Sequence, residues 1–255
     1  MRLQLSHASA VIVAYCASDP RHVFMDRKDQ THPRFYCRGG YCPIGGNRNR
    51  GRPEVGPRGL ALAELFEELT FQRVVRDDAE YKELGTTDTV SRYAATTISG
   101  ALITVEDATG LEAVKVAIER ATRPYGDFVA RIPNETIRLF EPNWDMGRPV
   151  VPYLCSVFDA GLDEEVWGEL VRLQDKFGNL SNESQTEVFH LAEMVARSDH
   201  GAFQHGPSMK HWWMDRGYSQ AAHLKMLPDI TAEFVGPCLE TWQEYDTGFE
   251  FKNLA

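Results

Sequence analysis

Runs of apolar residues predict β-strands in both halves of the chain. The segment ASAVIVAY at 8–15 is almost uniformly apolar and rich in β-branched residues, which predicts a strand buried on both faces. A turn-like SDPRH separates it from HVFMDRK at 22–28, and the two runs predict a hairpin. PVVPYLCSVFD at 149–159 predicts a further buried strand. The sheet is therefore expected to draw on distant parts of the chain.

Helical periodicity begins at Gly56-Pro57, because proline fits a first helical turn, where its missing N–H leaves no partner unsatisfied. An apolar stripe at i, i+3, i+4 and i+7 follows and predicts a core-facing side: Leu62, Leu65, Phe66 and Leu69. Glu64, Glu67 and Glu68 centre on the opposite side of this helix. Further helices are predicted at 110–123, 164–177 and 207–217, with a strand that turns into a helix at 186–197.

The remaining segments carry weaker patterns. Residues 29–56 are rich in glycine and predict a loop-dominated surface excursion. Strands are predicted at 100–107 and 135–141, and a short helical pattern is visible at 233–245. The regular strand–helix alternation of a doubly wound sheet is absent from the pattern, so the sequence predicts an α+β fold.

Composition and charge exclude some classes of function. The chain has 255 residues with 43% hydrophobic and 25% charged residues, which allows a sizeable core. Its net charge of −10 argues against a general nucleic-acid binder, which needs basic surface. Five scattered cysteines do not indicate a disulfide framework, and no apolar run is as long as a membrane span. The first apolar stretch predicts a strand rather than a signal peptide, so we expect a cytoplasmic protein.

The order of these elements resembles that of the Nudix hydrolases, whose signature is G-x5-E-x7-R-E-U-x-E-E-x-G-U, with U a bulky aliphatic residue. PIGG at 43–46 resembles the glycine loop of that family, and ELFEE at 64–68 resembles its catalytic helix. The second half adds three matches in the family's order: VVPYLCSVFDAGL to the central strand, GNLSNESQTEVFHLAEM to an acidic loop with a late strand and helix, and GAFQHGPSMKHWW to the closing helix.

The resemblance implies a single domain over 1–255 with a Nudix-like α/β/α sandwich, a mixed β-sheet and an inserted α/β segment. The insertion is expected at 72–147 and a C-terminal extension at 218–255. The implied activity is metal-dependent hydrolysis of the pyrophosphate in a nucleoside diphosphate linked to another group, such as a nucleotide sugar, ADP-ribose, a dinucleotide or a capped RNA end. The partner is therefore a nucleotide-derived small molecule, without membrane association, and the resemblance also allows a homodimer.

The resemblance assigns roles to residues of this chain. The metal ligands for Mg²⁺ or Mn²⁺ are expected to be carboxylates, which are hard oxygen donors, and the catalytic acids include two from a later loop. The assignment is Glu64, Glu67 and Glu68 as metal ligands, and Glu67, Glu68, Glu183 and Glu187 as catalytic residues. The substrate-binding residues are expected at the end of the second strand and in the glycine loop, namely Arg27, Lys28, Gly45 and Gly46.

Departures from the signature keep an alternative open. Ala63 stands where the family has the arginine that orients the glutamates, Thr70 replaces a glycine, and Glu54 lies one place from the expected acid. A binding or scaffold module without catalysis therefore remains the second hypothesis. A third is an unrelated α+β domain whose glutamates only form a solvated helix face. Glu183, Glu187, Arg27 and Lys28 could equally be solvated.

Cysteine and histidine do not form a recognisable zinc motif. Cys37 and Cys42 lack a second pair to complete four ligands. The spacings of His200, His205 and His211 match no pair on one helical face, which favours surface or packing roles. Trp212 and Trp213 are expected in the core.

Overall fold

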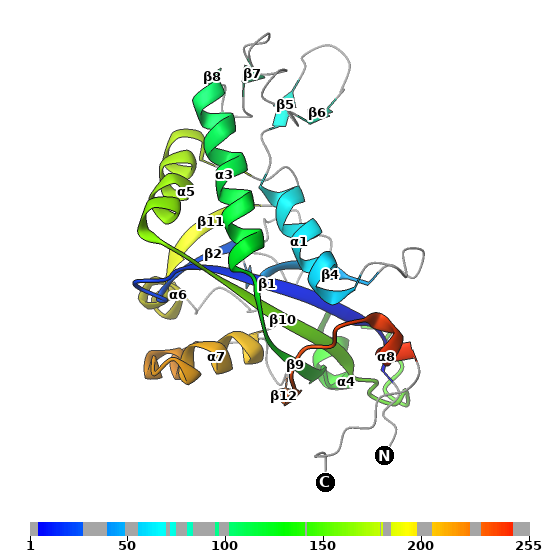
Figure 1. Ribbon diagram of the computed structural model, residues 1–255. Coiled ribbons are helices and arrows are strands. Elements are labelled where there is room, and N and C mark those ends of the chain that lie inside the picture. The colour runs from blue at the N-terminus through cyan, green and yellow to red at the C-terminus, as the bar shows by residue number, and fades with distance from the viewer. Residues whose placement is uncertain are drawn as a thin grey trace.

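The fold is built around one mixed sheet of eight strands. The computed structural model describes residues 5–27, 40–48, 56–69, 72–74, 81–83, 95–96, 102–140, 142–178, 180, 185–197, 206–224 and 231–246. The main strand order is β11-β2-β1-β10-β9-β12, with β3 paired to β2 and β4 paired to β1 (Figure 1). The strands are β1 (Ala8–Cys16), β2 (His22–Arg27), β3 (Tyr41–Cys42), β4 (Ile44–Asn47), β9 (Arg123–Arg131), β10 (Tyr153–Leu162), β11 (Gln185–His190) and β12 (Thr231–Gly236). Only β1 and β10 pair in parallel among these strands.

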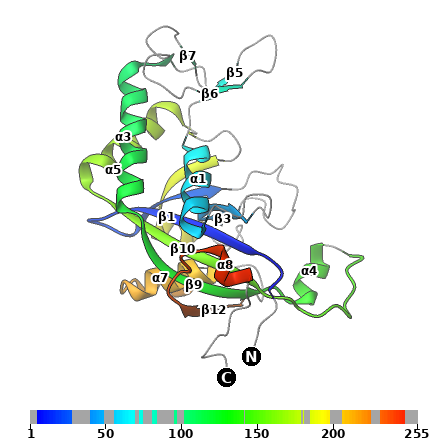
Figure 2. The same cartoon turned by 45° about the vertical axis from the view of Figure 1, so that its right-hand side comes forward.

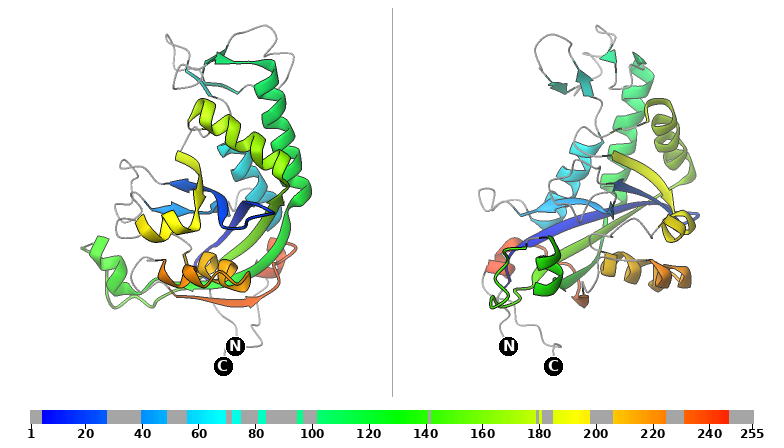
Figure 3. Two further views of the ribbon diagram at one scale, coloured as in Figure 1. Left: turned by 90° about the vertical axis from the view of Figure 1, so that its left-hand side faces the viewer. Right: turned by 180° about the vertical axis from the view of Figure 1, so that it is seen from behind.

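Helices cover both faces of the sheet, which gives three layers (Figures 1 and 3). One face packs against α1 (Pro57–Glu68), α3 (Val105–Ala121) and α5 (Glu164–Phe177). The other face packs against α6 (Leu191–Arg197), α7 (Gly206–Asp215) and the 3₁₀ helix η2 (Ser219–His223). The arrangement is an α+β fold with a mixed sheet, as the sequence predicts. We call the two faces the α1 face and the α7 face.

The alternation of side chains along β1 explains why its sequence is apolar throughout. Ala10 and Ile12 belong to the core on the α1 face, whereas Val11 and Val13 belong to the core on the α7 face. All four are buried. Burying a valine or isoleucine stabilises the fold by about 1.5–3 kcal/mol, so β1 anchors both layers.

The glycine-rich segment enters the sheet, contrary to the prediction of a loop over 29–56. β1 and β2 pair where Ala14 lies opposite Phe24, as the predicted hairpin requires. Farther along, Ile44 of β4 lies opposite Ile12 of β1, and Cys42 of β3 lies opposite Asp26 of β2. Residues 41–47 therefore occupy the space where β1 and β2 diverge. Gly45 and Gly46 lie in strand β4, not in a loop.

Three other sequence predictions are wrong in part. Residues 134–140 form helix α4 (Asn134–Phe140) instead of a strand, and this helix projects from one end of the sheet (Figure 2). The predicted strand at 100–107 is limited to β8 (Leu102–Ile103), because Thr104 and Asp107 form a capping box that starts α3. The predicted helical stretch at 233–245 begins as β12, where pairing with β9 overrides local propensity, and only α8 (Trp242–Asp246) is helical.

The segments expected to be an insertion and an extension both supply strands to the main sheet. β9, from 72–147, pairs with β10, and β12, from 218–255, pairs with β9. Residues 72–147 also carry two small sheets, one of β5 (Gln72–Val74) with β6 (Tyr81–Glu83) and one of β7 (Ala95–Thr96) with β8. β9 and β12 thus extend the main sheet on the side of β10. None of the helices in the described ranges is long and apolar enough to cross a membrane.

Candidate functional site

Helix α1 lies over β4 and presents its glutamates beside that strand. Gly56 caps the helix and Pro57 occupies its first turn, as the sequence predicts. Ala61, Leu62 and Leu65 are buried against the sheet and fix the rotation of the helix. Because these residues face inward, the position of each glutamate around the helix axis is determined.

The carboxylate of Glu64 packs directly on Gly46. A Cβ atom placed on Gly46 would lie 2.3 Å from the Cδ and Oε1 atoms of the Glu64 carboxylate. Only the missing side chain of Gly46 gives the carboxylate this position. Gly45 has a different reason to be glycine, since a Cβ there would lie 2.2 Å from the carbonyl oxygen of Ala10 in β1. One glycine therefore admits a carboxylate, and the other allows two strands to meet.

The three glutamates of α1 differ in exposure. Glu64 and Glu68 are half-buried, whereas Glu67 is exposed. Residues four apart lie on one side of a helix, so Glu64 and Glu68 share a side and Glu67 lies farther round. The structure thus brings Glu64 onto Gly46, with Glu68 half-buried one turn later and Glu67 exposed.

Two of the other predicted site residues lie on the α7 face. Arg27 has the strand parity of Met25, and Glu187 has that of Phe189, and both of these apolar side chains belong to the core on the α7 face. Glu187 lies opposite Met25 in the pairing of β11 with β2. Strand alternation therefore separates Arg27 and Glu187 from the glutamates of α1. Lys28 and Glu183 lie outside the described residues.

A buried acid on the α1 face escaped the sequence analysis. Asp26 of β2 is only 2% exposed and has the strand parity of Phe24, which packs in the core on the α1 face. It lies opposite Cys42 of β3. A carboxylate within the apolar run HVFM-D-R is the signal that could have identified it, because a buried charge needs specific partners.

Arg58 and Arg48 are the two arginines to consider in place of the signature arginine, whose position is occupied by Ala63. Ala63 itself is exposed. Arg58, in the first turn of α1, donates from Nη2 to the carbonyl oxygen of Glu119 at 2.7 Å and is therefore directed to α3. Arg48 follows Gly46 by two positions in an extended segment, so the two lie on the same side of the chain. Its guanidinium lies 5.5 Å from the centre of the Trp242 ring.

The donor set suits a hard divalent cation. Glu64 and Glu68 offer carboxylate oxygens on one side of a helix, and the Gly46 backbone leaves room for the Glu64 carboxylate. Mg²⁺ and Mn²⁺ prefer one or two carboxylates together with water and substrate phosphate oxygens. These residues therefore fit such an ion without a complete protein cage.

Of the three histidines considered for zinc, the structure describes His211, which lies on α7 and away from α1. His211 stacks on Phe234, with ring centres 5.6 Å apart, and its Nδ1 lies 2.5 Å from the hydroxyl of Tyr125. His211 therefore has a packing role, as the sequence predicts, and Trp212 and Trp213 are fully buried. His200, His205 and Cys37 lie outside the described residues.

No protein-family model matches the chain, and no curated protein matches it. Among solved structures, the chain is similar to the crystal structure of a NUDIX hydrolase from Alicyclobacillus acidocaldarius. The two are 13% identical, the match covers 77% of this chain and 84% of that chain, and the TM-score is 0.38.

Proposed function

We propose that the protein is a Mg²⁺- or Mn²⁺-dependent hydrolase that cleaves the pyrophosphate of a nucleoside diphosphate linked to another group. The observation that supports this most directly is the packing of the Glu64 carboxylate on Gly46, with Glu68 one helical turn later. Two half-buried carboxylates beside a strand with two adjacent glycines support a cation site in preference to a uniformly solvated helix face.

In this proposal, Glu64 and Glu68 hold the cation and Glu67 contributes negative charge from the exposed side of the helix. The bound cation would neutralise phosphate charge and help to activate water. Asp26 adds a buried carboxylate on the same face of the sheet. Arg48 supplies positive charge next to β4 and takes the role of the arginine that orients the glutamates, which Ala63 cannot perform. A planar guanidinium suits phosphate or carboxylate oxygens because it donates two parallel hydrogen bonds.

A binding module without catalysis is the second candidate, and the direction of Arg58 favours it. The Arg58 guanidinium donates to the backbone carbonyl of Glu119 on α3, and alanine at position 63 carries no charge that could orient the glutamates. Ligand binding requires only the carboxylates and the cation, whereas turnover requires their accurate placement.

The two candidates are separated by a hydrolysis assay on ADP-ribose, NAD, dinucleoside polyphosphates, nucleotide sugars and capped RNA with Mg²⁺ or Mn²⁺. The hydrolase proposal predicts metal-dependent turnover that falls by about 10²–10³-fold in a Glu64→Gln, Glu68→Gln variant. Glu67→Gln combined with Glu68→Gln tests the exposed glutamate. Glu112→Gln, on the exposed side of α3, is the matched control and should retain full activity. Turnover that survives in both double variants would refute the assigned site, and nucleotide binding without turnover would establish the second candidate.

A further inference from the structure

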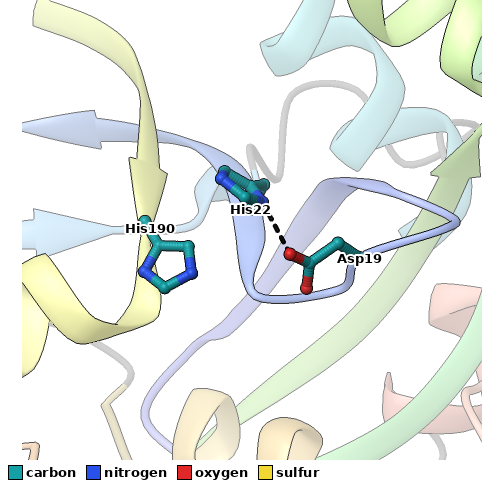
Figure 4. Close-up of side chains that lie close together, drawn as sticks. All are labelled: Asp19, His22 and His190. Atoms are coloured by element: carbon teal, nitrogen blue, oxygen red, sulfur yellow. Dashed lines mark ion pairs between the residues drawn. The ribbon is translucent and has the colours of Figure 1, made fainter.

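A second group of metal-ligating side chains lies where the β1–β2 turn meets the end of β11. Asp19, His22 and His190 each place one potential ligand atom within 4.8 Å of the others (Figure 4). His22 and His190 are cross-strand partners in the pairing of β2 with β11, and their ring centres are 4.6 Å apart. The Nδ1 atom of His22 is 3.2 Å from Oδ2 of Asp19.

Backbone hydrogen bonds hold this group together independently of any side chain. The N–H of Leu191 donates to the carbonyl oxygen of Arg21 at 2.8 Å, which ties the start of α6 to the turn. Within the turn, the N–H of His22 donates to the carbonyl oxygen of Asp19 at 3.0 Å. The three candidate ligands therefore come from two segments that are already fixed relative to each other, and a ligand set of this kind loses little entropy when it binds an ion.

We propose that Asp19, His22 and His190 bind a first-row transition-metal dication, of which Zn²⁺ is the reference case. Two imidazoles and one carboxylate are the donors that such ions select, whereas Mg²⁺ prefers oxygen alone. Three protein ligands leave at least one position for water. The side chains of His22 and Asp19 are 39% and 25% exposed, so an ion can enter from solvent.

The ligand atoms need only a small rearrangement to reach a common ion. Ligands about 2.1 Å from a tetrahedral metal lie about 3.4 Å from one another. The observed limit of 4.8 Å is therefore within the reach of rotations about the side-chain bonds. All three side chains are half-buried rather than locked in the core, which permits those rotations.

Two existing hydrogen-bonding contacts would compete with a metal ion for these ligands, and the first of them involves Asp19. Arg21 donates from Nε to Oδ1 of Asp19 at 2.7 Å and from Nη2 to Oδ2 at 2.8 Å. This contact, with burial acting in the opposite sense, lowers the pKa of Asp19 to about 2. The Arg21 side chain is 46% exposed, so its release into water has a small energetic cost.

The second competing contact concerns His190. Its Nδ1 accepts the backbone N–H of Ala192 at 3.1 Å, so the neutral ring carries its proton on Nε2. Coordination through Nδ1 would replace the Ala192 contact directly. Coordination through Nε2 would move the ring proton to Nδ1 and so break the same contact.

Zn²⁺ titration by calorimetry in a buffer freed of transition metals and containing excess Mg²⁺, together with the visible absorption spectrum of Co²⁺, tests the proposal. His22→Gln and His190→Gln should each weaken Zn²⁺ binding by at least about tenfold and change the Co²⁺ spectrum. Arg21→Gln should strengthen binding, since it releases both Asp19 oxygens and removes a positive charge. Because Arg21→Gln is expected to strengthen Zn²⁺ binding, this variant tests the proposal even if a histidine variant folds poorly.

His223→Gln is the matched control, because His223 is an exposed histidine outside the cluster. It should leave Zn²⁺ affinity unchanged. The Glu64→Gln, Glu68→Gln variant should also retain this Zn²⁺ site, so failure of the proposed hydrolase and failure of the transition-metal site give different results. Unchanged Zn²⁺ affinity in the two histidine variants, or weaker binding in Arg21→Gln, would overturn the proposal.

Discussion

The carboxylate of Glu64 occupies the space in which a side chain at position 46 would lie. A Cβ on Gly46 would be 2.3 Å from Oε1 of Glu64, well inside van der Waals contact. The neighbouring Gly45 faces the backbone of β1, where a Cβ would be 2.2 Å from the Ala10 carbonyl oxygen. Gly46 thus leaves room for a carboxylate, and Gly45 allows β4 to approach β1.

This difference predicts opposite outcomes for two alanine substitutions. Gly46→Ala should displace only the flexible end of Glu64, so metal binding and turnover fall while stability changes by less than about 1 kcal/mol. Gly45→Ala forces β4 away from β1 and should cost about 3 kcal/mol or more. Urea unfolding and Mn²⁺ titration of both variants measure the two effects.

Gly168→Ala is the control for these substitutions. A Cβ on Gly168 meets no atom within 4 Å, and the residue lies within α5. Alanine there should stabilise the protein by about 0.5–1 kcal/mol without any effect on metal affinity. If Gly46→Ala behaved like this control in both measurements, the packing of Glu64 on Gly46 would have no functional meaning.

Most of the fold could be predicted from local pattern, but the relation of β4 to the sheet could not. The apolar run at 8–15 and the periodicity of α1 are local signals, and both elements are confirmed. Ile44 pairs with Ile12 and Cys42 with Asp26 through contacts distant in sequence, which no short pattern contains. Glycine composition alone therefore indicated a loop.

The candidate site likewise combines residues that a local sequence pattern identifies with residues that only strand pairing places. Glu64 and Glu68 could be selected because ELFEE, after the PIGG segment, resembles the catalytic helix of the Nudix family, whereas helical spacing alone predicts a solvated face. Arg48 and Asp26 were missed because their position relative to α1 depends on strand pairing. The family resemblance predicts a catalytic role for Glu187, but its parity on β11 places it on the α7 face.

The buried carboxylate of Asp107 should make stability sensitive to acid. Asp107 is 1% exposed and accepts hydrogen bonds from Lys176, Arg172 and the backbone and hydroxyl of Thr104. Burial opposes its ionisation, but these donors outweigh that effect and hold its pKa well below the ordinary value. Asp107→Ala removes a capping box and two ion pairs and should destabilise the protein by about 2–4 kcal/mol.

The sign of the pH effect follows from the lowered pKa of Asp107. A carboxylate with a lower pKa in the folded state contributes its full stabilisation above its unfolded pKa and loses it as pH falls toward the folded value. Unfolding free energy should therefore decrease below about pH 4, and Asp107→Asn should show a smaller decrease over this range. Glu112→Gln, which removes an exposed pair with Lys115, should change stability by less than about 0.5 kcal/mol. Equal acid sensitivity in wild type and Asp107→Asn would contradict this assignment.

Arg216 should be more important for stability than its partial exposure indicates. Its guanidinium forms an ion pair with Asp159 and lies 4.0 Å from the centre of the Trp212 ring. The indole N–H of Trp212 donates to the same carboxylate at 2.8 Å. Arg216→Lys keeps the charge but loses the planar contact, so thermal unfolding should show a loss of about 1–2 kcal/mol. Arg120→Lys, on an exposed turn of α3, should be neutral, and equal stability of the two variants would contradict the stacking role.

Arg48 is predicted to assist turnover beside β4. Arg48→Lys retains a positive charge but cannot donate two parallel hydrogen bonds, so kcat should fall by about tenfold or more while Mn²⁺ affinity changes little. Steady-state kinetics with the best substrate of the hydrolysis panel provides the measurement. An unchanged kcat would place Arg48 in the packing of Trp242 alone.

The central claim is that Glu64 and Glu68 of α1 form a divalent-cation site beside Gly46. Its most direct test is Mn²⁺ binding followed by electron paramagnetic resonance, in wild type and in the Glu64→Gln, Glu68→Gln variant, with Zn²⁺ present to occupy the Asp19 cluster. The predicted result is one Mn²⁺ site in the wild type that weakens by at least about tenfold in the variant. The same Mn²⁺ affinity and stoichiometry in a folded variant would contradict the claim.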